Sequence, residues 1–316
     1  MTAGHLPLGP GAEFDTVRAT LARWGSLARG TGDDAALLDV PPGRHLVIST
    51  DTAVENVHFR RAWLSAEEIA YRAGVAAVSD LAAMGATPFA MVISLTLPDS
   101  WRSQAMGLAD GIAIVARDTG TRIVGGDLTS GTELSIGITV LGMVDRALTR
   151  SGARPGDLLW VTGRLGGPGQ ALKAWKKGVE PRPVDRARFA RPSPRLREAR
   201  WLGARGANAA IDISDGVASD AAHIAAASRM RLTLDLGRLP CLVGSSPQES
   251  ARSGEEYELL LSAPASFDPG EFEREFALPI TAVGSVRSPG PEGEGLDVVF
   301  NGERVKLPQG HDHFST

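Results

Sequence analysis

The stretch ALTRSGARPGDLLWVTG, residues 147–163, divides this chain into two halves. Its first part, 147–157, is rich in turn-forming and basic residues, and a new apolar strand is expected at 157–163. Alternating strand and helix patterns precede this stretch, and they restart after it. We therefore expect two α/β domains, residues 1–147 and 148–316, and 316 residues are enough for two hydrophobic cores.

The first half begins with apolar residues at helical spacing over 14–27. The strand LVIST at 46–50 leads into Asp51, which we place at a strand end. A helix over 66–85 has acidic residues in its first turn and contains Asp80. The remaining expected elements are a strand at 89–97, a helix near 102–118, a strand at 122–126 and an alternating strand at 133–144.

The second half has a longer series of elements. Helices are expected near 168–177, 195–205 and 216–228, and strands near 157–163, 208–213, 231–236, 256–263, 280–286 and 296–300. The segment 178–194 contains four prolines and several arginines, so we interpret it as a surface loop.

Composition excludes several classes of protein. The net charge of -4 argues against a nucleic-acid-binding surface, which would be strongly basic. No stretch reaches the ~18 consecutive apolar residues needed to span a membrane, and the N-terminus does not resemble a signal peptide. We expect a soluble, cytoplasmic protein. The single cysteine, Cys241, excludes an intramolecular disulfide and is expected to be a small, partly buried hydrophobe.

Five carboxylate-centred stretches suggest the chemistry: GDDAALLD at 32–39, ISTD at 48–51, SDLAAMGA at 79–86, GGDLTSG at 125–131 and IDISDG at 211–216. Magnesium prefers oxygen ligands, usually one or two carboxylates with waters and substrate phosphates. Carboxylates alone would repel a nucleotide, so this set suits phosphates only if several metal ions lie between them. Metal-assisted phosphoryl transfer is the natural hypothesis.

Each stretch also has a simpler structural interpretation. GDDAALLD and GGDLTSG could be turns, Asp51 could be a helix cap, and His58 in ENVHF could be a surface-loop histidine. Asp80 lies in an almost entirely apolar helix, where a buried carboxylate needs a metal or a partner such as Arg72. Ser214 or Asp215 could cap the helix from 216, but capping does not account for Asp212.

No covalent nucleophile is evident. The chain has no G-x-S-x-G elbow, and Cys241 follows a proline with no evident histidine partner. The Gly-rich stretch VTGRLGGPGQAL at 161–172 lacks both the Lys-Ser/Thr of a P-loop and the glycine spacing of a dinucleotide-binding turn.

Taken in order, GDDAALL, STDT, NVHF, SDLAAMGA, GGDLTSG, LTRSGARPGD, AIDISDG and GEEYEL resemble the motifs of the thiamine-monophosphate kinases. That family belongs to the aminoimidazole-ribotide synthetase superfamily of ATP-using enzymes. The resemblance extends from about residue 30 to GHDHF at 310–314. It implies an N-terminal ATP- and Mg²⁺-binding domain whose strands pair with those of a second subunit, a C-terminal α/β domain, and a homodimer.

The implied reaction transfers the γ-phosphate of ATP directly in line onto thiamine monophosphate, with several Mg²⁺ ions and no phosphoenzyme, and forms thiamine diphosphate, the last step of that synthesis. The resemblance also assigns residues to roles. The implied magnesium ligands are Asp34, Ser49, Thr50, Asp51, Asp80, Asp127, Asp212 and Asp215. The implied ATP contacts are Gly126, Asp127, Arg150 and Ser214. The implied substrate contacts are His58, Glu255 and His311.

Two positions depart from the family pattern: His311 replaces a larger aromatic residue, and Ser253 replaces a glycine. Other members of the superfamily fit less well. Selenophosphate synthetase would need a reactive cysteine or selenocysteine and a lysine within residues 1–30, and the hydrogenase-maturation dehydratases carry a C-terminal cysteine. Aminoimidazole-ribotide synthetase is disfavoured by NVHF and GEEYEL. A catalytically silent nucleotide sensor is the alternative from another class, although the intact set of carboxylates argues against it.

Overall fold

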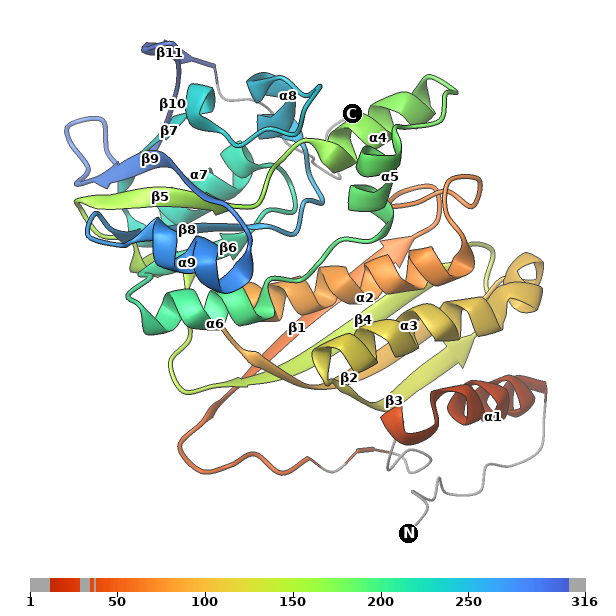
Figure 1. Cartoon of the computed structure of the whole chain (residues 1–316). Coiled ribbons are helices and arrows are strands. Elements are labelled where there is room, and N and C mark those ends of the chain that lie inside the picture. The colour runs from red at the N-terminus through yellow and green to blue at the C-terminus, as the bar shows by residue number, and fades with distance from the viewer. Residues whose placement is uncertain (1–11, 29–34, 37, 307–316) are drawn as a thin grey trace. The chain divides into compact units, whose positions relative to one another are not determined.

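The computed structural model describes residues 12–28, 35–36 and 38–306. The chain forms two compact units (Figure 1). The N-terminal unit comprises residues 1–81 and 86–145, and the C-terminal unit comprises 82–85 and 146–316. Within the described ranges, no helix is both long and apolar enough to cross a membrane.

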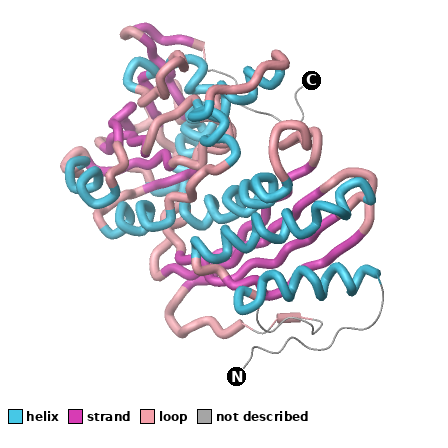
Figure 2. The backbone as a smooth tube through the Cα atoms, turned by 45° about the vertical axis from the view of Figure 1, so that its right-hand side comes forward, coloured by secondary structure: helices cyan, strands magenta, loops and turns pink. Residues whose placement is uncertain are grey.

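The N-terminal unit is a four-stranded sheet with helices on one face (Figure 2). The strand order is β1-β4-β2-β3, with β4 antiparallel to β1 and β2 and with β2 parallel to β3. The strands are β1 His45–Val54, β2 Thr87–Thr96, β3 Arg122–Thr129 and β4 Ser135–Val144. The helices are α1 Ala12–Trp24, α2 Ala66–Ala83 and α3 Ala105–Thr119, with 3-10 turns η1 Gly25–Leu27 and η2 Asp99–Gln104.

Alternation along β4 determines which face of this sheet is covered. Ile136, Ile138 and Val140 are buried, and the residues between them are half-buried. The opposite face is open and partly apolar, because Leu46 is 40% exposed, Ile48 60% and Val92 36%. Among the described residues, no strand pairs with the outer sides of the two edge strands, β1 and β3.

The C-terminal unit has a seven-stranded sheet with the order β11-β10-β7-β9-β5-β8-β6. The strands are β5 Asp157–Thr162, β6 Ala209–Asp212, β7 Arg231–Asp235, β8 Leu259–Pro264, β9 Ile280–Arg287, β10 Gly295–Phe300 and β11 Glu303–Val305. The helices are α4 Gly167–Lys176, α5 Pro183–Ala190, α6 Leu196–Ala204, α7 Val217–Ser228, α8 Pro247–Arg252 and α9 Pro269–Phe276, with 3-10 turns η3 Arg150–Gly152 and η4 Leu236–Arg238.

Two apolar clusters cover the two faces of this sheet. Leu159 and Val161 of β5 pack in one cluster with the buried side of α7, and Cys241 borders that cluster as a partly buried residue. Trp160, between them in sequence, packs in the other cluster with α6 and with Phe272 of α9. Successive residues of a strand point to opposite faces, so a continuous apolar strand is covered on both sides.

Two sequence-based predictions were wrong, and one open alternative is excluded. Asp51 does not end a strand, because β1 continues to Val54 through the β-favouring residues Thr52 and Val54. The alternative that GGDLTSG is a turn does not hold for residues 125–129, which belong to β3. Residues 178–194 are not only loop: Pro183 occupies the first turn of α5, where its missing N–H costs nothing.

Candidate active site

Ser49 and Asp80 form one half of a polar cluster in the N-terminal unit. The Ser49 hydroxyl donates a hydrogen bond to Oδ2 of Asp80, which joins β1 to the last turns of α2. Asp51 lies two residues further along β1, on the same half-buried side of the strand as Ser49. These three oxygen-bearing side chains therefore gather at one edge of the sheet. Thr50 points to the other face, where its hydroxyl lies 3.1 Å from that of Thr139 on β4.

His58 lies in the turn that follows β1. Its Nδ1 accepts a hydrogen bond from the backbone N–H of Val54 at 3.0 Å, so Nε2 carries the proton in the neutral ring. Glu55 anchors the same turn, because its Oε2 accepts a hydrogen bond from Trp101 Nε1 at 2.8 Å. The His58 ring is thus held in one orientation by its Nδ1 atom.

Gly126 and Asp127 lie on β3, at the other edge of the sheet. Two strands separate β3 from β1, so about 14 Å separates the edges of the sheet within one chain. A side chain at Gly126 is excluded, since a Cβ there would lie 2.3 Å from the carbonyl oxygen of Ile93. Asp127 is exposed on the open face. The structure does not bring Asp127 next to Asp51 and Asp80 within one chain.

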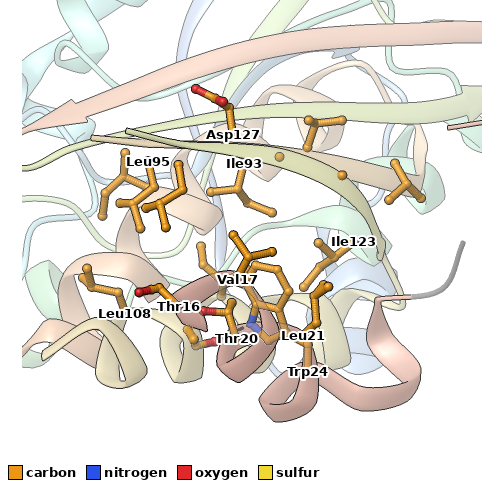
Figure 3. Close-up of a pocket in the computed structure, with 18 of the residues that line it drawn as sticks. Thr16, Val17, Thr20, Leu21, Trp24, Ile93, Leu95, Leu108, Ile123 and Asp127 are labelled. Atoms are coloured by element: carbon orange, nitrogen blue, oxygen red, sulfur yellow. Dashed lines mark hydrogen bonds between the residues drawn. The ribbon is translucent and has the colours of Figure 1, made fainter. Parts of the chain in front are cut away.

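A cavity of about 720 Å³ lies between α1, α3 and the sheet (Figure 3). Its walls are mostly apolar and include Val17, Trp24, Leu108 and Ile123, while Gly125, Gly126 and Asp127 form part of its lining on β3. Helix α1 is attached to α3 beside it, because Trp24 Nε1 donates to the carbonyl oxygen of Ala109 at 2.8 Å. The cavity is large enough for a small organic ligand or a nucleoside.

In the C-terminal unit, the loop after β6 packs against the loop before β8. The backbone N–H of Glu255 donates to the carbonyl oxygen of Ser214 at 2.6 Å, and the N–H groups of Glu256 and Tyr257 both donate to Ile213. Glu255 and Tyr257 have left-handed backbone conformations, with φ of 61° and 52°. Such conformations cost free energy and persist where surrounding bonds hold them, often at functional sites. This contact brings Ser214, Asp215 and Glu255 together.

Asp212 ends β6 and is 4% exposed. Close to it is Asp220, in the first turn of α7, which is 1% exposed. Burial and repulsion by Asp212 and Asp215 raise the pKa of the Asp220 carboxyl well above its ordinary value of 3.8. Sequence reasoning did not single out Asp220, although the spacing in IDISDGVASD places it one turn into the helix after Asp215.

Arg150 lies at the far end of α7 from this loop. Its carbonyl oxygen accepts a hydrogen bond from Ser228, the last residue of the helix, at 2.7 Å. About 16 Å of helix separates that contact from the loop that carries Ser214. The structure therefore does not place Arg150 beside Ser214.

Ser253, the departure from the family's glycine, is buried and has hydrogen-bond partners on two elements. Its hydroxyl accepts from the Gly169 N–H at 3.0 Å and donates to Glu256 Oε1 at 2.5 Å. Glu256 also accepts from the Gly166 N–H at 2.5 Å, and burial raises the pKa of its carboxyl to about 7. The Ser253 hydroxyl thereby connects the start of α4 to the loop that presents Glu255.

A buried ionic network is centred on Glu258, at the end of the loop that carries Glu255. Glu258 is 0% exposed and accepts hydrogen bonds from Arg195 at 2.7 and 2.5 Å, from Arg188 at 2.9 Å and from Thr162 at 2.7 Å. Arg188 belongs to α5, one of the helices that the sequence prediction missed. The network attaches α5 and the start of α6 to β8.

The remaining sequence-predicted site residues, Asp34 and His311, lie outside the described residues. Across the ranges that the structure describes, no three Asp, Glu, His or Cys side chains are close enough to form a preassembled metal site. The predicted ligands instead form separate groups, which are Ser49, Thr50, Asp51 and Asp80 at one edge of the N-terminal sheet, Asp127 at its other edge, and Asp212 and Asp215 in the C-terminal unit.

Two family models match the chain in order. The N-terminal domain of AIR synthase related proteins matches residues 32–144, and the C-terminal domain of the same class matches residues 154–290. Fold and site thus define a two-domain α/β protein of this class, as the sequence predicted.

Relatives of the whole chain are more specific. The thiamine-monophosphate kinase of Escherichia coli strain K12 is 35% identical over 96% of both proteins. The crystal structure of thiamine-monophosphate kinase from Stenotrophomonas maltophilia K279a has a TM-score of 0.81 and 33% identity, over 93% of this chain and 98% of that one. A structure of AaThiL complexed with AMPPCP and TMP has a TM-score of 0.77 and 29% identity, over 95% and 96%. The chain belongs to the thiamine-monophosphate kinase family.

Proposed function

We propose that this protein is an ATP-dependent kinase that phosphorylates thiamine monophosphate to thiamine diphosphate. The observation that carries the proposal is the likeness, over nearly the full length of both chains, to a protein complexed with AMPPCP and TMP. The 35% identity to a thiamine-monophosphate kinase over 96% of both chains supports the same activity. We assign nucleotide and metal binding and dimerisation to residues 1–147, and the second α/β domain to 148–316. A kinase acting on metabolites with ATP would work in the cytoplasm.

The donor set fits magnesium, because it consists of carboxylates and hydroxyls and contains no thiolate. A buried oxygen of Asp220 that accepts no hydrogen bond also fits a nearby cation. The residues that would hold the ions are Asp34, Ser49, Thr50, Asp51, Asp80, Asp127, Asp212 and Asp215. Bound Mg²⁺ would neutralise the phosphate oxygens during direct in-line transfer.

The protein's own residues would bind and orient the two substrates. Arg150 and Ser214 would contact ATP, as would Gly126 and Asp127. His58 would donate its Nε2–H to the phosphate of thiamine monophosphate, because Nδ1 is already an acceptor. Glu255 and His311 would complete that substrate's site. In this arrangement, catalysis rests on orientation and charge neutralisation.

The apolar cavity is a suitable place for the adenine base. Gly126 and Asp127 border it, and the absence of a side chain at Gly126 leaves its backbone accessible to a phosphate. An apolar wall formed by Val17, Trp24 and Leu108 would cover the ring.

A homodimer would complete this site. If β1 of one subunit pairs with β3 of its partner, two four-stranded sheets close into an eight-stranded barrel with no free edge. The apolar open face with Leu46, Ile48 and Val92 would become the barrel interior. The same pairing would bring Asp127 of the partner subunit close to Thr50 and Asp51. Within one chain, Asp127 and these two residues lie at opposite edges of the sheet.

The first test of function is product formation from ATP, Mg²⁺ and thiamine monophosphate, followed by chromatography. Thiamine diphosphate should form only from the monophosphate and only with Mg²⁺. Asp80→Asn should reduce turnover at least about 100-fold. Asp118→Asn is the matched control, because Asp118 also lies near the end of a helix but is exposed. ATP binding without product would instead favour a catalytically silent sensor.

The dimeric site is tested by mixing two inactive variants, Asp51→Asn and Asp127→Asn, after dissociation and reassembly. If Asp51 and Asp127 of a site come from different subunits, each mixed dimer has one intact site. Half of the dimers are mixed, so activity should return to about one quarter of wild type. If both residues act from the same chain, the mixture stays inactive and the shared site is refuted.

A further inference from the structure

The carboxylate of Asp220 has an unusual environment. It is 1% exposed, in the first turn of α7, and its Oδ2 atom is buried without a hydrogen-bond partner among the described residues. Its other interactions are hydrogen bonds from the backbone N–H groups of Asp215 and Gly216. The Asp220 carboxylate therefore holds the loop after β6 through these two hydrogen bonds, whereas its Oδ2 atom faces no donor among the described residues.

Two further carboxylates, Asp212 and Asp215, act on Asp220 by repulsion. Among the described residues, the charged groups that act most strongly on Asp220 are these two carboxylates, and none of them is a lysine, arginine or histidine. A buried carboxylate without a compensating partner is costly. A buried carboxylate with one unsatisfied oxygen, on which two further carboxylates act by repulsion, indicates that a cation compensates Asp220 in the working state of the protein.

Helix capping alone does not explain the residue. A cap needs only an oxygen acceptor, which serine, threonine or asparagine supplies without burying a charge. The backbone N–H groups of Asp215 and Gly216 use that acceptor function, yet Oδ2 stays unsatisfied. Among the described residues no three Asp, Glu, His or Cys side chains form a preassembled metal site, which favours contact through a bridging water over direct ligation by Asp220.

We propose that Asp220 is a positioning residue of the magnesium site, which orients the loop bearing Asp215 and accepts, through Oδ2, a hydrogen bond from a water bound to Mg²⁺ at Asp212 and Asp215. The inference rests on the proposed magnesium site in the C-terminal unit. Carboxylates of this outer layer fix the ligands and their waters, and their loss usually reduces metal affinity 10–100-fold.

The test measures Mg²⁺ binding and stability rather than turnover. Asp220→Asn keeps an oxygen acceptor for the two backbone N–H groups and removes the charge. The full chain is titrated with MgCl₂ by calorimetry, and its thermal unfolding is followed with and without MgCl₂. Asp268→Asn is the matched control, because Asp268 accepts the N–H of Gly270 at the start of α9 but is exposed.

The proposal expects Asp220→Asn to weaken Mg²⁺ binding about 10–100-fold. It also expects the variant to lose the rise in Tm that Mg²⁺ gives the wild type, and to have an equal or higher Tm without metal. A purely structural cap would lower Tm equally with and without Mg²⁺ and leave the affinity unchanged, which would overturn the proposal.

Asp220→Ser is the second variant, since serine also supplies an acceptor and no charge. If neither variant folds without Mg²⁺, the carboxylate is needed for folding itself and the proposal is overturned. Asp212→Asn separates the two levels of the argument. Wild type and Asp212→Asn binding Mg²⁺ equally would refute the proposed metal site, whereas loss in Asp212→Asn alone, with normal binding in Asp220→Asn, would refute only the role of Asp220.

Discussion

Replacing Glu258 by glutamine should destabilise the C-terminal unit strongly. The carboxylate is 0% exposed and accepts three hydrogen bonds from the guanidinium groups of Arg188 and Arg195 and one from Thr162. A glutamine amide of nearly the same shape would turn an N–H donor toward these donors. It would also leave two cations, 22% and 12% exposed, without their common counter-charge.

The expected cost is about 3–5 kcal/mol, the range for removing one partner of a buried ion pair. The lower part of that range applies because Arg188 retains Glu256 at 3.4 Å and Arg195 retains Glu198 at 3.6 Å. The matched control is Glu271→Gln. Its pair with Arg205, at 3.3 Å, is about half exposed on both sides, so its loss should cost less than about 1 kcal/mol.

The assay is urea unfolding at neutral pH, monitored by tryptophan fluorescence. The variants are compared only if the slopes of unfolding free energy against urea concentration are nearly identical. Two units can give two unfolding transitions. The relevant transition is that of the C-terminal unit, which contains both Glu258 and Glu271. A loss below about 1 kcal/mol for Glu258→Gln, no larger than that of the control, would refute the view that this network stabilises the unit.

Three further predictions concern single positions. The pKa of Glu256 is raised to about 7 in the folded protein, so its contribution to stability is fully present below about pH 4.5 and is lost as pH rises to about 7; Glu256→Gln should flatten urea midpoints measured across that window. Ser246→Ala removes one half of the capping box of α8 and should cost about 1 kcal/mol in chemical unfolding. Gly126→Ala should cost about 1–3 kcal/mol of stability and weaken ATP binding in calorimetry, because the new Cβ would lie 2.3 Å from the carbonyl oxygen of Ile93. The control is Gly125→Ala, whose Cβ would meet only one atom, at 4.0 Å, and which should bind ATP normally. Equal effects at both positions would contradict this reasoning.

Local pattern was sufficient for most helices and strands, but not for elements that begin with proline. Helices α5, α8 and α9 all start with proline in the first turn, and each is only six to eight residues long. Short helices have a weak apolar period and depend on tertiary contacts for stability. In α5, Phe189 packs against Trp175 of α4 with ring centroids 5.3 Å apart, a contact that no local pattern reveals.

The candidate site was predicted from residue type and order more than from geometry. Asp80, Asp212 and Asp215 stood out because a carboxylate inside an apolar segment, or after one, needs a reason to be there. Asp220 did not, and Ser253 stood out only as a departure from the family's glycine, because the importance of both depends on which group faces them. The unsatisfied Oδ2 atom of Asp220 and the bridging hydroxyl of Ser253 depend on contacts between segments far apart in the sequence, so neither segment shows them by itself.

The sequence by itself determined the two α/β halves, because they depend on periodicity, and its side-chain chemistry predicted an oxygen-rich ligand set and transfer without a covalent nucleophile. Only the tertiary structure decided that Asp51 and Asp127 lie on opposite edges of one sheet, that the sheet keeps an apolar open face, and that the loops of Ser214 and Glu255 are bonded together. Strand order and loop contacts join residues far apart along the chain, and the energies that select them come from packing and hydrogen bonds that local sequence does not contain.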